Sequence, residues 1–180
     1  AWVGEARHAF GMSHAFADFD GDGQLDIYMT GMGSTTARRL DFMGLKRDEH
    51  PDIDAMRAAM GYGNRMFLRR GDRFVDEASE RGVLDAGNGM GVSFGDFNND
   101  GRLDLHVTNM SSTAGNRILG RLFPGATASS NVLKKLASGN SLFENVGGGR
   151  FREVTTEVGP FGGAWAWGGG FVDFDNDGHE

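Results

Sequence analysis

An aspartate-rich loop occurs three times in this chain, as DFDGDGQLD from Asp18 to Asp26, DFNNDGRLD from Asp96 to Asp104 and DFDNDGHE from Asp173 to Glu180. Carboxylates at alternate positions of a short loop, with a glycine where the backbone turns sharply, let hard oxygen ligands converge on one cation. The loops therefore predict calcium sites. Magnesium ranks second because it dehydrates reluctantly and demands a tighter octahedron. Turns that hold no metal are the remaining alternative, since aspartate, asparagine and glycine also favour turns.

The first two loops offer a full set of predicted ligands, with a backbone carbonyl at position seven, whereas the third stops before position nine. The predicted ligands of the first loop are Asp18, Asp20, Asp22, Gln24 through its carbonyl, and Asp26. Those of the second are Asp96, Asn98, Asp100, Arg102 through its carbonyl, and Asp104. Those of the third are Asp173, Asp175, Asp177 and His179 through its carbonyl. Weaker binding is expected in the second loop, which has one charge fewer, and a crippled site in the third.

The sequence around the loops excludes an EF-hand, in which a bidentate glutamate at position 12 lies between two helices. Position 12 is Met29 in the first loop and Val107 in the second. The segments that follow, at 25–30 and 103–109, alternate roughly between apolar and polar residues over β-prone sequence. Short strand-like segments also precede each loop. A dockerin-like site is excluded for the same reasons, and each loop is expected to join two strands.

The repeat extends well beyond the loops. Their first aspartates stand at positions 18, 96 and 173, so the periods are 78 and 77 residues. Downstream, 63–79 aligns with 139–156, and both segments are expected to be hairpins with a glycine turn. One unit thus contains four strands, which is the content of a propeller blade. We expect an all-β propeller fragment with a first blade at 1–88, a second at 89–164, and the first strand and truncated loop of a third at 165–180.

The order of strand, DxDxDGxxD loop, strand and N-x-x-F hairpin resembles the FG-GAP or VCBS repeat of integrin-alpha-type β-propellers. The GNRMFL and GNSLFEN hairpins and the WAWGGGFVDFDNDG segment are similar to bacterial VCBS proteins related to the cartilage acidic protein family. The resemblance covers nearly the whole chain. It implies about seven blades in the intact protein, and in the bacterial relatives a UnbV-type domain can follow. It also implies calcium ions that rigidify one rim, an activity of binding or adhesion, and no catalytic residues.

Two segments interrupt the blades between their second and third strands, at 34–62 and 111–138. Helical spacing is expected at 36–47, 51–60, 116–123 and 130–138. Long insertions on a compact blade are where binding residues often lie, so a protein or carbohydrate ligand, or a larger assembly, could engage them and the loops. The simpler interpretation is that their apolar residues cover a blade edge.

Charge and composition exclude several classes of partner. The formal net charge is −7, ten aspartates lie in the three loops, and no Lys/Arg-rich block exists that would bind a phosphate backbone, so nucleic acid is not expected. No apolar run approaches the roughly 18 residues of a membrane span. The absence of cysteine fits a periplasmic or extracellular location and equally permits the cytosol. Millimolar external calcium would fill weak loops of this kind, which favours the periplasmic or extracellular location.

Two further motifs carry no catalytic expectation. Gly91 to Gly95 fits G-x-S-x-G, but a metal loop and a strand follow it instead of the helix that a nucleophile elbow needs. Trp165 and Trp167 would share one strand face, where packing between blades is preferred over a carbohydrate platform. The expected function is a calcium-stabilised extracytoplasmic scaffold for binding, adhesion or assembly, and not an enzyme. The alternatives are a propeller attached to a polysaccharide-processing enzyme, whose catalytic groups lie outside this chain, and a structural subunit of a membrane-associated complex.

Overall fold

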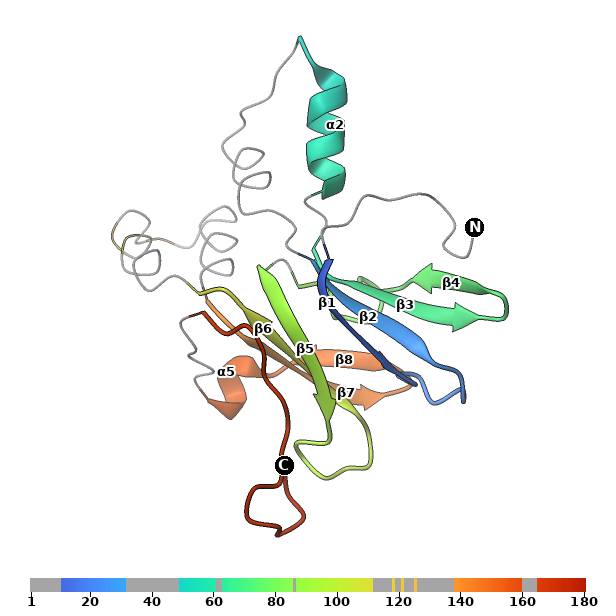
Figure 1. Cartoon of the computed structure of the whole chain (residues 1–180), viewed down its shortest axis with the longest axis vertical. Helices are drawn as coiled ribbons and strands as arrows, with labels where there is room; N and C mark the ends of the chain where they lie inside the picture. The colour runs from blue at the N-terminus through green and yellow to red at the C-terminus, as the bar shows by residue number, and fades with distance from the viewer. Residues whose placement is uncertain are drawn as a thin grey trace.

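The computed structural model describes residues 11–31, 49–60, 63–85, 87–111, 118, 121, 125, 138–159 and 165–180, with side chains omitted at 56–60. These residues form two four-stranded antiparallel sheets with their strands in chain order (Figure 1). The first sheet contains β1 (Gly11–Ala17), β2 (Asp26–Gly31), β3 (Arg65–Arg70) and β4 (Arg73–Asp76). The second contains β5 (Gly89–Gly95), β6 (Asp104–Asn109), β7 (Ser141–Gly147) and β8 (Arg150–Glu153). The all-β expectation is confirmed, with the four strands per unit of a propeller fragment.

The two sheets repeat the same register. Ala17 pairs with Asp26 in the first sheet, and Gly95 pairs with Asp104 in the second, so each pair joins the residue before an aspartate loop to the last residue of that loop. At the far end of the same strand pair, both sheets have a register shift, between Gly11 and Ser13 and at the corresponding place in β5. The sequence period therefore corresponds to a repeated backbone, although β7 has a further register shift, between Asn145 and Gly147, that β3 lacks.

Helices contribute little to the described part of the chain. Helix α2 (Pro51–Met60) lies in the first insertion, as predicted, and projects away from the sheets in Figure 1. The other helical segments expected in the insertions, at 36–47, 116–123 and 130–138, lie outside the described residues apart from isolated positions. A single-turn helix, α5 (Thr155–Val158), follows β8 and was not predicted. No helix among the described residues is long and apolar enough to cross a membrane.

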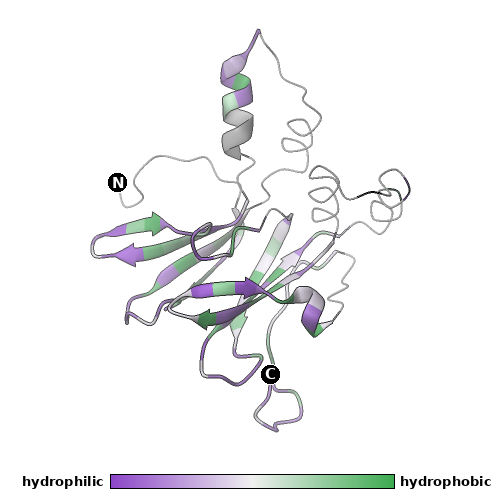
Figure 2. Ribbon diagram, turned by 180° about the vertical axis from the view of Figure 1, so that it is seen from behind, coloured by the Kyte–Doolittle hydropathy of each residue, from purple (hydrophilic) through white to green (hydrophobic). Residues whose placement is uncertain are grey.

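The main core lies between the two sheets. Alternate residues of each strand face it, which Figure 2 shows as bands of opposite hydropathy along the strands. The first sheet and its loop contribute Ala17, Phe19, Tyr28, Met66 and Leu68. The second sheet contributes Leu105, Val107, Phe143 and Phe151, with Val92 and Phe94 packed against them. A backbone hydrogen bond from the Phe151 N–H to the Arg81 carbonyl, at 2.8 Å, also joins the two units.

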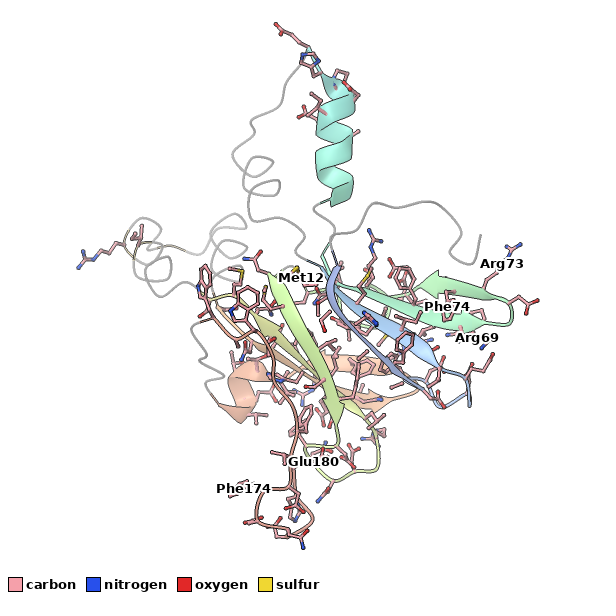
Figure 3. All side chains as sticks on the ribbon, in the orientation of Figure 1. Met12, Arg69, Arg73, Phe74, Phe174 and Glu180 are labelled. Carbon is pink, nitrogen blue, oxygen red and sulfur yellow. The ribbon has the colours of Figure 1, made fainter. Side chains whose placement is uncertain are left out.

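The phenylalanine at position two of each loop differs in burial among the three loops. Phe19 is 2% exposed, and its ring centroid lies 4.5 Å from that of Phe94 in the second sheet. Phe97 in the second loop is half-buried. Phe174 in the third loop is 89% exposed and projects from the C-terminal segment in Figure 3. The loop phenylalanine of one unit is thus a core residue of the contact with the next.

The segment at 165–180 departs from the sequence-based expectation. Its only β-pairing among the described residues is an isolated bridge between Met110 and Trp165, so the first strand expected there does not form. A strand needs a hydrogen-bonded neighbour along its length, and this segment pairs at one residue only. The expected packing of Trp165 and Trp167 between blades is also wrong, since they are 60% and 66% exposed.

The contrast between equivalent phenylalanines gives a stability prediction. Replacing Phe19 with alanine is expected to lower the free energy of unfolding by about 3–5 kcal/mol, because it leaves a cavity between the sheets. The matched Phe174→Ala variant is expected to change it by less than about 0.5 kcal/mol, because that ring is exposed. Urea denaturation followed by circular dichroism measures both. Similar losses for the two variants would contradict the packing described here.

Candidate metal centre

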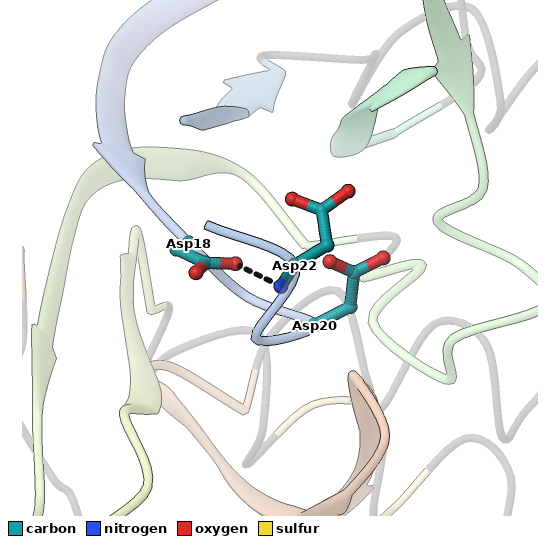
Figure 4. A group of neighbouring side chains, drawn as sticks. All are labelled: Asp18, Asp20 and Asp22. Carbon is teal, nitrogen blue, oxygen red and sulfur yellow. Dashed lines mark hydrogen bonds between the residues drawn. The ribbon is translucent and has the colours of Figure 1, made fainter. Parts of the chain in front are cut away.

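The first aspartate loop brings three carboxylates together. Asp18, Asp20 and Asp22 each offer an oxygen, and these oxygens all lie within 4.8 Å of one another (Figure 4). Asp18 accepts hydrogen bonds from the backbone N–H groups of Gly21 at 2.8 Å, Asp22 at 3.0 Å and Gly23 at 2.8 Å. The loop backbone is therefore wrapped around the Asp18 carboxylate. The carboxylates of Asp20 and Asp22 approach it from the same loop.

The sharp turn at position six is confirmed in every loop. Gly23, Gly101 and Gly178 have φ angles of 83°, 82° and 89°, a left-handed conformation that glycine adopts without the steric strain of a Cβ. Position four is also left-handed in each loop, at Gly21, Asn99 and Asn176. We did not predict this second turn from the sequence, although glycine and asparagine are the residues that tolerate it.

Asp20 carries the clearest sign of a cation-binding position. Its Oδ2 is paired with the Arg70 guanidinium at 2.8 Å, whereas its Oδ1 is buried and has no hydrogen-bond partner in the described part of the chain. Burying a charged oxygen without a partner is unfavourable, and a bound cation would satisfy it. The predicted ligand side chains of this loop are all aspartates, and their carboxylate oxygens fit a hard divalent cation.

The second loop has the same wrapping with a different charge distribution. Asp96 accepts the backbone N–H groups of Asp100 at 2.9 Å and Gly101 at 2.7 Å. The Asn98 side-chain amide donates to Asp100, and Arg102 of the loop itself also pairs with that carboxylate. The only ligand-type carboxylates of this loop outside position nine are thus Asp96 and Asp100.

The third loop repeats the geometry of the first. Oxygens of Asp173, Asp175 and Asp177 lie within 4.8 Å of one another, and Asp173 accepts the Gly178 N–H at 2.8 Å. The loop lies against the second one, where the Asp96 N–H donates to the Glu180 carboxylate at 2.8 Å. The sequence-predicted carboxylates of this loop are therefore gathered as they are in the first loop.

The predicted carbonyl ligands follow one backbone pattern. The N–H groups of Gln24, Arg102 and His179 each donate to the aspartate two residues earlier, at 2.8, 3.0 and 2.8 Å. This shared hydrogen bond holds the backbone of position seven in the same way in all three loops. Position seven, whose carbonyl is a predicted ligand, therefore has the same backbone restraint in all three loops.

The aspartate at position nine has a role that the loop pattern does not reveal. Asp26 is fully buried and accepts the backbone N–H of Phe19 at 3.1 Å and that of Arg69, in β3, at 2.7 Å. Asp104 repeats this with Phe97 at 3.2 Å and Asn145 at 2.7 Å. Each carboxylate therefore joins the loop to the third strand of its sheet. Asp26 is not one of the three carboxylates gathered in the first loop, although the oxygens of Asp26 and Asp104 keep lone pairs available for a cation.

Burial disfavours the charge on these two carboxylates. Desolvation raises the pKa of Asp104 to about 6, against the lowering effect of its two backbone hydrogen bonds, and the negative charges of Asp100 and Asp96 raise it further. The pKa of Asp26 is raised for the same reasons, with Asp20 and Asp22 as the neighbouring charges. A cation in the loop would oppose this repulsion and favour the ionised forms.

Two arginines lie beside the first loop and were not predicted from the sequence. Arg70 contacts Asp20, approaches Asp22 at 3.7 Å and pairs with Glu77 at 3.2 Å. Arg81 pairs with Glu77 at 2.8 Å, lies 3.8 Å from Asp20 and also donates to the carbonyl of Gly148 in the second unit. Only the tertiary structure brings these side chains, about 50 or more residues downstream, to the loop.

Comparison with known proteins supports part of the resemblance. The FG-GAP-like repeat matches residues 45–107, which contain α2, β3, β4, β5, the second loop and most of β6. No curated protein matches the chain. The chain is thus similar to FG-GAP repeat proteins over this range, which supports an FG-GAP repeat family and a β-propeller-type module.

The structural role of the two hydrogen bonds that Asp26 accepts can be tested without metal. In the presence of a chelator, Asp26→Ala is expected to lower the free energy of unfolding by about 2–4 kcal/mol, because the N–H groups of Phe19 and Arg69 lose their buried acceptor. The control is Asp72→Ala in the exposed β3–β4 turn, with an expected change below about 0.5 kcal/mol. Chemical denaturation measures both, and equal losses would show that Asp26 has no special structural role.

Proposed function

We propose that this chain is a calcium-stabilised β-propeller module that serves as a scaffold for binding or adhesion outside the cytoplasm. The observation that carries the proposal is the buried, unpaired Oδ1 of Asp20 within a group of three converging carboxylates. The second and third aspartate loops repeat this pattern and support the same chemistry. Calcium is favoured over magnesium because the loop offers several flexible oxygen ligands.

The proposed ion is structural. The first loop joins β1 to β2 and packs on the second sheet through Phe19, whose carbonyl also accepts a hydrogen bond from the Asn145 amide at 3.5 Å. A cation held by Asp18, Asp20 and Asp22, together with the Gln24 carbonyl and Asp26, would hold this contact in one conformation. The energy of binding would then stabilise both the loop and the junction between the units.

We propose no catalytic role for the chain. Ser93, the serine of the G-x-S-x-G match, lies inside β5, and the strand continues into the second aspartate loop instead of turning into a helix. The insertions and loops remain the proposed contact regions for a protein or carbohydrate ligand, or for a larger assembly. An extracellular or periplasmic location fits the proposal, since calcium there reaches the concentrations that weak extracellular modules require.

Calcium is expected to raise the melting temperature of the chelated protein by about 5–10 °C when present at about 100 times its dissociation constant. The reason is that the folded loops bind the ion and the unfolded chain lacks the gathered carboxylates. Differential scanning calorimetry after chelation and calcium re-addition measures the shift. Magnesium at the same concentration is expected to give a smaller one.

A control variant removes one predicted calcium ligand from the first loop and one from the second. In the Asp22→Ala, Asp100→Ala double variant the calcium-dependent shift is expected to fall by at least half, because each loop loses one carboxylate. An unchanged melting temperature of the original chain on chelation and calcium re-addition would refute the calcium proposal.

A further inference from the structure

The strongest unexplained feature of the first loop is the arginine that lies against it. The Arg70 guanidinium is 2.8 Å from Asp20 Oδ2 and 3.7 Å from Asp22 Oδ2, so it faces two of the three gathered carboxylates. It comes from the end of β3, and its side chain is 35% exposed whereas that of Asp20 is 11% exposed. A positive charge is therefore held inside the ligand set of the proposed ion.

The second repeat has no charged residue at the position equivalent to Arg70. Aligning the hairpin at 63–79 with that at 139–156 places Val146 opposite Arg70 and Val154 opposite Glu77, and the same register places Val158 opposite Arg81. Val146 is 50% exposed and lies near the end of β7, as Arg70 lies at the end of β3. The three ionic side chains beside the first loop thus correspond to three valines in the second repeat.

Glu77 gives Arg70 an alternative partner. It lies 3.2 Å from the Arg70 guanidinium and 2.8 Å from that of Arg81, which also donates to the Gly148 carbonyl of the second unit. If a cation took Asp20 and Asp22, Arg70 would still be paired with Glu77. An exchange between guanidinium and metal at the loop therefore leaves no arginine without a carboxylate.

From these contacts we infer that Arg70 is an intramolecular competitor of calcium at the first loop, so that the affinity of this loop is lower than its four aspartates predict. The inference rests on the proposed calcium function. The paired guanidinium stabilises the metal-free loop, and a positive charge a few ångströms from a divalent cation destabilises the bound state. Both effects weaken binding at the first loop. In the second loop Val146 stands at the position equivalent to Arg70, so this competitor from the third strand is absent, and the arginine that pairs with Asp100 there is Arg102 of the loop itself.

The experiment measures calcium binding to the full chain by isothermal titration calorimetry, one loop at a time. With the second and third loops disabled by Asp100→Ala and Asp177→Ala, Arg70→Gln is expected to tighten calcium binding at the first loop about tenfold. Arg70→Lys keeps the charge and is expected to tighten it far less. The control is Arg73→Gln, an exposed arginine of the same hairpin (Figure 3), with an expected change below about twofold.

The reciprocal variant transfers the charge to the second repeat. With the first and third loops disabled by Asp22→Ala and Asp177→Ala, Val146→Arg is expected to weaken calcium binding at the second loop about tenfold. Because Val146 is half exposed, this substitution tests the inference even if Arg70→Gln fails to fold.

The outcomes separate the two proposals. Calcium binding that is unchanged or weaker in a folded Arg70→Gln variant overturns the inference alone, as does a Val146→Arg variant that binds as tightly as its parent. Absence of calcium binding at both loops of the original chain overturns the proposed function, and the inference with it. Tighter binding in Arg70→Gln together with weaker binding in Val146→Arg supports both.

Discussion

The buried carboxylate at position nine of the first two aspartate loops is the interaction on which the rest of the structure depends. Asp26 begins β2, accepts the N–H of Phe19 in the loop and accepts the N–H of Arg69 in β3. One side chain therefore determines how the loop leaves β1 and where the third strand lies beside the second. Asp104 makes the same two contacts in the second sheet, so the second and third strands are joined to the loop in the same way in both units.

The position of the loop then decides how the two sheets meet. With its backbone held by Asp26, the first loop directs Phe19 into the core beside Phe94, while Asp18, Asp20 and Asp22 face one another at the surface. The apolar and acidic residues of one nine-residue segment are thus separated by the turns at positions four and six. Packing between the units and the gathering of oxygen ligands have the same structural cause, so a cation in the loop would stabilise both.

The charged side chains around the loops distinguish the two repeats more than the number of aspartates in the loops does. The first loop has one aspartate more than the second, which by itself favours tighter binding of a cation. Arg70 and Arg81, however, place guanidinium groups at the first loop, and Arg81 reaches the Gly148 carbonyl of the next unit. In the second loop the arginine belongs to the loop itself, at Arg102, and pairs with Asp100. A count of carboxylates is therefore an incomplete guide to affinity.

The sequence by itself determined the repeat, the four strands of each unit, the strand–loop–strand setting of the aspartates, the glycine turn at position six and helix α2, because these depend on local periodicity and backbone preference. Only the tertiary structure decided that Asp26 also bonds Arg69, that Arg70 lies on Asp20, and that Trp165 and Trp167 are exposed. Such contacts join residues tens of positions apart, or depend on whether a neighbouring strand is present. Their energies arise from burial and charge proximity, which exist only after the strands have assembled.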